Sequence, residues 1–185
     1  MKKYVAEFIG TFALVFCGTG ALVIDEITHG SVTHTGISIT FGLIVTSMIY
    51  TMGDKSGAHL NPAVTLAFAA NKSFPVKEII PYTISQFTGA LCASLVLKIL
   101  FPASILLGTT IPAGSDKQSF ILELILTLFL MLVIINVSTG SKEQGLFAGI
   151  AVGAVVGLEA MFAGPISGAS MNPQDLSLLL SFQEN

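Results

Sequence analysis

The amino-acid sequence predicts an all-α membrane protein built as an inverted repeat with two re-entrant half-helices. Of its 185 residues, 52% are hydrophobic and only 10% are charged, whereas a soluble domain carries about 25% charged residues. Five apolar segments are long enough to cross a bilayer, and the pattern Ser-Gly-Ala-x-x-Asn-Pro occurs twice, at 56–62 and 167–173. The composition therefore indicates a membrane protein, and the duplicated pattern indicates two related halves.

The five predicted spans are each mostly apolar and about 20 residues long, the length that crosses the hydrocarbon core. They cover residues 4–24, 36–53, 76–101, 119–137 and 145–163, with polar connections at 25–35, 102–117 and 138–144. The segments 64–70 and 176–180, which follow the two Asn-Pro pairs, are too short to span. We expect each to be a half-helix that enters the membrane and turns back, because irregular backbone at that depth must be buried in protein or line a wet cavity.

Each Asn-Pro pair predicts the start of a helix. Asn is a strong helix N-cap, and Pro is favoured at the first helical position because its missing N–H would have no partner there. An isolated pair could be an ordinary turn, but two copies of the longer pattern in one apolar chain make chance a poor explanation. The motif positions are Asn61, Pro62, Ala63, Asn172, Pro173 and Gln174.

The two halves are expected to have opposite orientations in the membrane. Three spans, at 4–24, 36–53 and 76–101, make up the first half, so the second half must be inverted and its Asn-Pro loop enters from the other face. We therefore predict one domain, 1–185, with a first repeat at 1–101 and an incomplete second repeat at 119–185. Lysines concentrate beside alternate ends of the spans, which predicts a cytoplasmic N-terminus; they are Lys2, Lys3, Lys55, Lys72, Lys77 and Lys142.

The two loops would meet near the midplane and form a site for a neutral solute. Each half-helix N-terminus carries roughly +0.5 of an elementary charge, which opposes cations and protons, and Asn amides can donate to a passing oxygen. Glu7 and Glu123 lie early in the first span of each half, where a carboxylate is costly unless it has a role. We expect them to accept hydrogen bonds from the loop of their own half; a proton relay is the alternative. His59, Gly57 and Gly168 could line the path, although a structural role for His59 is equally compatible with its position.

Several function classes are excluded at this stage. No nucleophile, base and acid set and no metal-ligand cluster is apparent, so we expect no enzyme, no cofactor and no metal site. A net charge of −3 and the absence of Arg disfavour a nucleic-acid partner. A secondary transporter with inverted repeats would need ion-coordinating residues that we do not find. A passive pore in a lipid bilayer is the favoured reading.

At these residues the chain resembles the aquaporin family, the major intrinsic proteins. The matching stretches are Ala-Glu-Phe-x-Gly-Thr-Phe at 6–12, the ten residues 56–65, Gln86 with Gly89, and 164–169, so that the resemblance extends from residue 1 to 173. It implies six spans, a pore in each protomer, a homotetramer, and a channel for water or small neutral solutes such as glycerol, in the plasma membrane. It also implies a second constriction, whose four positions fall on Phe41, Ala160, Ala169 and Asp175. Small side chains at two of them suggest a wide opening.

The second motif departs from the family pattern. The family would have Asn-Pro-Ala-Arg-Ser-Leu, whereas this chain has Gln174 and Asp175 after Pro173, and a sixth span is missing. Deleting one base from codons for Pro-Ala-Arg-Ser-Leu can produce Pro-Gln-Asp-Leu, so we hypothesise a one-base frameshift after the codon of Pro173. The alternative function is therefore a non-conducting truncated product. We expect the chain as written to fold or conduct poorly, because Asp175 would reverse the charge at the constriction and lipid would meet irregular backbone.

Overall fold

The computed structural model describes residues 1–109, 112–141 and 145–173, all of whose regular elements are helical. Five helices in this part of the chain are long and apolar enough to cross a membrane, which confirms the predicted fold class. The helices are α1 (Lys2–Ile27), α2 (Thr33–Ser56), α3 (Pro62–Ala70), the 3₁₀ turn η1 (Val76–Glu78) leading into α4 (Ile79–Leu100), α5 (Asp116–Thr139) and α7 (Ala148–Ser167). The half-helix and the sixth span considered for residues beyond 173 fall outside the described residues.

Several helix ends differ from the sequence expectation. The predicted polar connection at 25–35 is shorter, because α1 continues to Ile27 and α2 begins at Thr33. Asp25 stays helical and its Oδ1 accepts from the backbone N–H groups of Val32 and Thr33, at 3.0 and 2.8 Å, so the polar residue supports a tight turn. The C-terminal end of α7 also differs, since the helix extends past the expected position 163 to Ser167.

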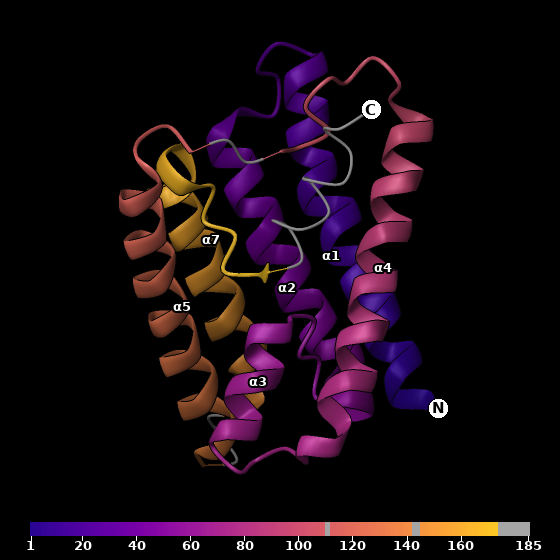
Figure 1. Cartoon of the computed structure of the whole chain (residues 1–185), viewed down its shortest axis with the longest axis vertical. Helices are drawn as coiled ribbons and strands as arrows, with labels where there is room; N and C mark the ends of the chain where they lie inside the picture. Colours follow the sequence, from indigo (N-terminus) through magenta and orange to yellow (C-terminus); the bar gives the residue numbers. More distant parts are fainter. Residues whose placement is uncertain (110–111, 142–144, 174–185) are drawn as a thin grey trace.

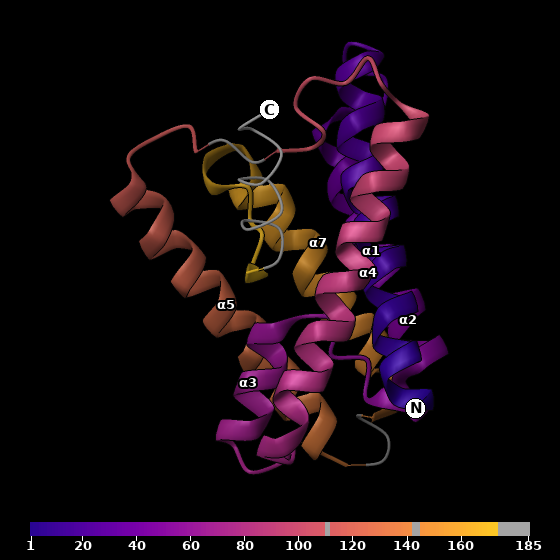
Figure 2. The same ribbon diagram turned by 45° about the vertical axis from the view of Figure 1, so that its right-hand side comes forward.

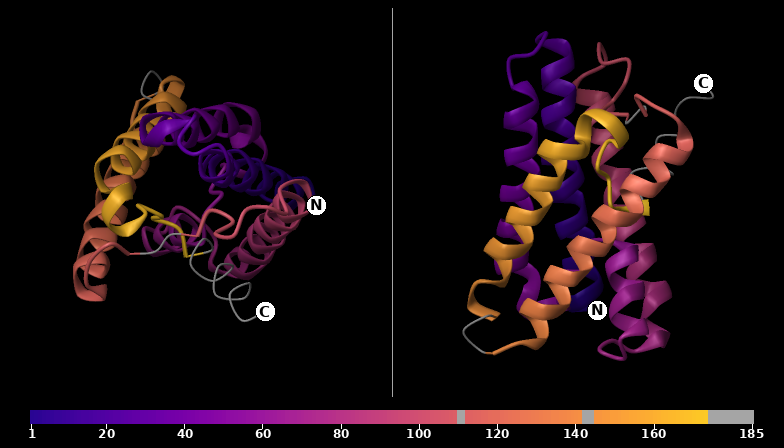
Figure 3. Two further views of the ribbon diagram at one scale, coloured as in Figure 1. Left: turned by 90° about the horizontal axis from the view of Figure 1, so that it is seen from above. Right: turned by 90° about the vertical axis from the view of Figure 1, so that its left-hand side faces the viewer.

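The long helices surround the short α3 and the two Asn-Pro loops. Helix α2 packs against α1 and α7, α1 also packs against α4, and α5 packs against α7. Seen along the long axis of the molecule, these helices form an incomplete ring around the segments at the centre (Figure 3). Helix α3 begins near mid-height and runs toward the face that carries the N-terminus, which we call the N-terminal face (Figure 1). The segment after α7 enters from the opposite face, which we call the far face (Figures 1 and 2).

Contact between the halves depends on a close crossing of α2 and α7. A Cβ added to Gly42 would lie 2.7 Å from the carbonyl oxygen of Gly153, and one added to Gly153 would lie 2.4 Å from the carbonyl oxygen of Gly42. Neither position can hold a larger residue without moving the backbone, since small residues are what allow membrane helices to approach this closely. The crossing fixes the distance between the two Asn-Pro loops, which follow these helices.

Candidate functional site

The two Asn-Pro loops share one backbone conformation. Gly57 and Gly168 are left-handed C-caps of α2 and α7, with φ of 87° and 90°, and their N–H groups donate to the carbonyls four residues earlier at 2.8 and 3.0 Å. Glycine adopts this conformation without steric cost, which explains its use after each helix. Left-handed φ recurs at matching positions of both loops: 48° at Ala58, 47° at Ala169, 53° at Leu60 and 48° at Met171.

One carboxylate supports the backbone of each loop. Glu7 accepts from the N–H groups of His59 and Leu60 at 3.0 and 2.8 Å. Glu123 accepts from the N–H groups of Ser170 and Met171 at 3.1 and 2.9 Å. Hydrogen bonds to charged acceptors are about twice as strong as neutral ones, so each carboxylate can hold a strained turn. These are the contacts that loop anchoring requires.

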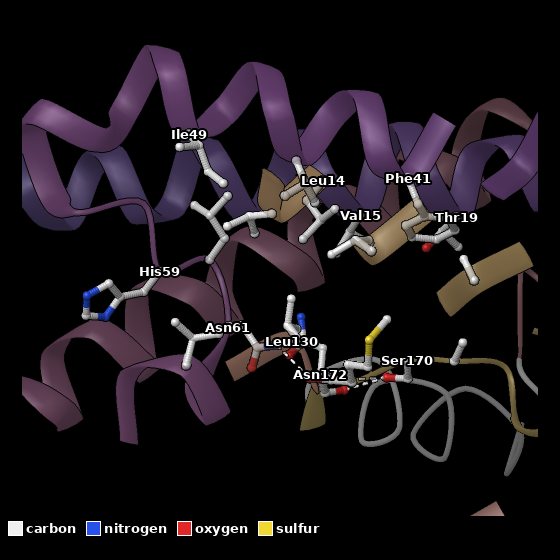
Figure 4. Close-up of a pocket in the computed structure, with 18 of the residues that line it drawn as sticks. Leu14, Val15, Thr19, Phe41, Ile49, His59, Asn61, Leu130, Ser170 and Asn172 are labelled. Carbon is white, nitrogen blue, oxygen red and sulfur yellow. Dashed lines mark hydrogen bonds between the residues drawn. The ribbon is translucent and has the colours of Figure 1, made fainter. Parts of the chain in front are cut away.

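Asn61 joins the two halves at the centre of the molecule. Its Oδ1 accepts from the N–H of Ala63 at 2.8 Å and so caps α3, while its Nδ2 donates to the carbonyl of Met171 at 2.7 Å. Asn61 and Asn172 are both buried and both line the cavity (Figure 4). Pro62 and Ala63 form the first turn of α3 behind Asn61, whereas Pro173 is the last residue described.

A cavity of about 250 Å³ runs past both loops. Its wall is mainly apolar and is formed by α1, α2, α5, α7 and the loops; Asn61 and Asn172 supply polar groups on one side (Figure 4). Of the residues singled out from the sequence, the cavity is lined by Phe41, Gly57, His59, Asn61, Ala160, Gly168, Ala169 and Asn172. Gln174 and Asp175, the other motif and constriction positions, lie outside the described residues.

The structure brings three of the four expected constriction residues to the same cavity. Phe41 lies toward the end opposite His59 (Figure 4), and its ring packs so closely on α1 that a Cβ at Gly18 would meet it at 2.2 Å. Ala160 and Ala169 are buried small residues on α7 and the second loop. All three residues line the cavity, and the constriction that the resemblance implies at these positions stays a prediction.

His59 is held by an aromatic cluster at the opposite end of the cavity. Its ring centroid lies 4.9, 4.7 and 5.2 Å from those of Phe68, Phe74 and Tyr82, and Nδ1 lies 3.1 Å from the hydroxyl of Thr65. The side chain is 8% exposed and still contacts the cavity. His59 therefore lines the cavity and is also held in place by its neighbours, so the two roles considered for it from the sequence are compatible.

Sequence reasoning missed the residues that complete the first site. Gln86, noted only as part of the resemblance, donates from Nε2 to Glu7 at 2.8 Å and to Thr65 at 3.1 Å. Tyr82 donates from its hydroxyl to the carbonyl of Ser56 at 2.8 Å. Both lie on α4, four residues apart, and a pair of polar residues at i and i+4 inside an apolar span was the signal that could have indicated a shared buried face.

Comparisons with known proteins agree with this geometry. The sequence profile described as Major intrinsic protein matches residues 1–177. Aquaporin NIP1-3 of Oryza sativa subsp. japonica is 49% identical over 174 residues, covering 93% of this chain and 60% of the relative, and Nodulin-26 of Glycine max is 42% identical, covering 94% and 64%. The X-ray structure of the aquaglyceroporin from Plasmodium falciparum superposes with a TM-score of 0.83 at 28% identity, covering 98% of this chain and 82% of that one. The chain thus spans about three fifths of the length of the curated relatives it matches.

Proposed function

Because the chain belongs to the major intrinsic protein family, whose profile matches nearly all of it, we propose that it forms a passive channel for water and small neutral solutes such as glycerol. Members of this family are integral membrane channels and not enzymes. The observation that carries the proposal is the cavity of about 250 Å³ that both Asn-Pro loops line, with Asn61 and Asn172 both in its wall. A channel needs a continuous lining supplied by both halves, and this arrangement supports one.

The lining suits an uncharged solute that forms hydrogen bonds. A mostly apolar wall does not replace the hydration shell of an ion, so an ion would enter at a high desolvation cost. The N-terminus of α3 lies at Asn61, and its partial positive charge opposes cations. Water or a polyol can accept a hydrogen bond from an Asn amide while its carbon atoms contact the wall. Selectivity then follows from cavity width and from donors placed on one side.

The width at Phe41, Ala160 and Ala169 favours solutes larger than water. Two of the three lining residues are alanines, which leave room that bulkier residues would fill, and the solved structure whose fold matches is named an aquaglyceroporin. We include Asp175 in the proposal as the fourth constriction position, where a carboxylate would attract cations. Cation leak should therefore be measured together with solute flow.

Membrane orientation and assembly are part of the same proposal. Lys2, Lys3, Lys55, Lys72 and Lys77 belong to the N-terminal face, and lysine-rich ends favour the cytoplasm. We propose a plasma-membrane protein with a cytoplasmic N-terminus that assembles as a homotetramer. Large apolar side chains exposed on the outer surfaces of α4, α5 and α7 support burial against lipid or neighbouring protomers; examples are Ile84, Phe120, Leu128 and Phe162.

The experiment is solute and water flow into proteoliposomes, followed by light scattering after an osmotic step. The channel proposal requires the unaltered chain to pass water and glycerol faster than protein-free vesicles, whereas the charge of Asp175 predicts that it folds or conducts poorly; this measurement decides between the two. Ala160→Phe should reduce glycerol flow by about tenfold or more because the added ring fills the constriction. Leu158→Phe, at an exposed position of the same helix, is the matched control and should leave flow unchanged. Flow equal to that of empty vesicles, with a correctly folded protein, would contradict the channel and support the non-conducting alternative.

A further inference from the structure

A carboxylate outside the Asn-Pro sites ties the segment after α4 to the end of α1. Glu26 is the penultimate residue of α1. Its Oε2 accepts from the hydroxyl of Ser104 at 2.5 Å, and its Oε1 accepts from the N–H groups of Ile105 and Leu106 at 3.0 and 3.2 Å. A negative charge at a helix C-terminus is unfavourable with respect to the helix dipole, so these three donors compensate for its position.

The bound segment forms a tight turn that is specified by its own contacts. Ser104, which is buried, also accepts from the N–H of Leu107 at 3.0 Å, and the N–H of Thr109 donates to the carbonyl of Leu106 at 2.8 Å. Leu107 and Gly108 have φ of 47° and 72°. A left-handed φ is strained for Leu, so the turn needs external contacts to hold it.

The turn lies against the channel wall. A Cβ added to Gly108 would be 2.4 Å from Cγ2 of Thr19, so only glycine fits against this part of α1. Leu107, Gly108 and Thr19 all line the cavity, as does Phe41, and Thr19 and Phe41 lie together at the end opposite His59 (Figure 4). Further along the segment, the N–H of Ala113 donates to the carbonyl of Ile166 at the end of α7, at 3.0 Å. The segment therefore contacts α1 at the cavity wall and, through Ala113, the end of α7.

We propose that Glu26 is a positioning residue that holds Leu107 and Gly108 at the far mouth of the cavity and so limits the size of the solute that enters. This inference rests on the proposed channel function. It assigns size selection to a second place, outside the constriction at Phe41, Ala160 and Ala169. Releasing the turn should widen the mouth for long polyols and leave the flow of water unchanged.

The test compares the ratio of erythritol to water permeability in proteoliposomes. Glu26→Ala removes all three acceptor contacts and should raise the ratio by about threefold or more. Glu26→Gln keeps one oxygen for the two N–H groups and should restore most of the original selectivity. Leu107→Ala shortens the side chain at the mouth without releasing the turn, and it should raise the ratio as well.

Asp25→Ala is the matched control for Glu26→Ala. Asp25 is the neighbouring acid and also accepts from two loop N–H groups, but its loop, 28–32, is not part of the cavity lining. This variant should lose a similar amount of stability and leave the ratio unchanged. If it changed the ratio as much as Glu26→Ala does, general loosening of the far face would explain the result and the proposal would be wrong.

Hydrogen exchange of the folded protein in vesicles tests whether Glu26 holds the turn, without a measurement of flow. The amides of Ile105 and Leu106 should exchange at least about tenfold faster in Glu26→Ala than in the unaltered chain, and those of Val32 and Thr33 should not change. Equal exchange at Ile105 and Leu106 in the variant and in the unaltered chain would show that Glu26 does not hold the turn. If the channel conducts but its erythritol-to-water permeability ratio does not change in the Glu26 and Leu107 variants, only the size selection is wrong. If the unaltered chain conducts nothing, the proposed function is contradicted, and the selectivity assigned to Glu26 with it.

Discussion

The two Asn-Pro loops have the same backbone, but their supports differ. In the first half, Glu7 is fully buried and accepts from two loop amides and from Gln86 of α4. In the second half, Glu123 is half-buried and accepts from two loop amides and from the hydroxyl of Ser167, at 2.6 Å, at the end of α7. Within the described residues, no helix equivalent to α4 contributes a donor to Glu123.

The comparison separates what shapes a loop from what stabilises it. One carboxylate with two amide donors is common to both loops, and it accompanies the same sequence of left-handed residues in each. A strained backbone residue costs on the order of 1–3 kcal/mol and persists only when its surroundings determine it. The shared contacts therefore accompany the conformation in both loops, and α4 adds a further hydrogen bond to Glu7 from Gln86.

The largest expected effect on stability comes from making the same substitution at both carboxylates. Glu7→Gln places an amide N–H₂ against buried donors and should lower the free energy of unfolding by about 3 kcal/mol. Glu123→Gln should cost about 1.5 kcal/mol, because its site is less buried and water can compensate. Unfolding in mixed micelles titrated with SDS would measure both. Equal losses would show that α4 does not strengthen the first site.

The next prediction concerns the bond that joins the loops. Asn61→Ala removes the N-cap of α3 and leaves the carbonyl of Met171 without this donor, and it should cost about 2 kcal/mol. Asn61→Ser keeps a capping oxygen and loses only the bridge, so its loss should be about half as large. The difference between the variants measures the cap, and the loss in Asn61→Ser measures the coupling of the halves. A fully stable Asn61→Ser would show that the bridge at 2.7 Å contributes nothing.

Sequence reasoning succeeded where the signal is local. Apolar length predicted the five long helices, and Asn followed by Pro predicted the start of α3 at Pro62. It was less successful with contacts between distant segments. Glu26 received no role, because its donors lie about 80 residues later in a polar connection whose composition is typical of any loop. The repeat domains and the pore roles of the site residues stay predictions.

A smaller effect tests the contribution of α4 directly. Gln86→Leu removes the donor to Glu7 and Thr65, but it also removes a buried carbonyl oxygen for which the described residues supply no partner. The two effects partly cancel, so the expected loss is about 1 kcal/mol. Thr88→Val, on the exposed face of the same helix, removes only local hydrogen bonds to the carbonyls of Ile84 and Ser85 and should change stability by less than about 0.5 kcal/mol. If Gln86→Leu lost no more stability than Thr88→Val, the greater stability of the Glu7 site would come from burial alone.

The last comparison concerns the serines that precede the loops. Ser56 and Ser167 each accept from the N–H two residues later, at 3.0 and 3.2 Å. Ser167 also donates to Glu123 at 2.6 Å, whereas the hydroxyl of Ser56 reaches only the carbonyl of Met52, at 3.5 Å. Ser167→Ala should therefore cost about 1.5 kcal/mol and Ser56→Ala about 0.5 kcal/mol. The reverse order would mean that the second loop does not use this hydroxyl in place of the donor that α4 provides to the first, and the two carboxylate sites would then differ in burial only.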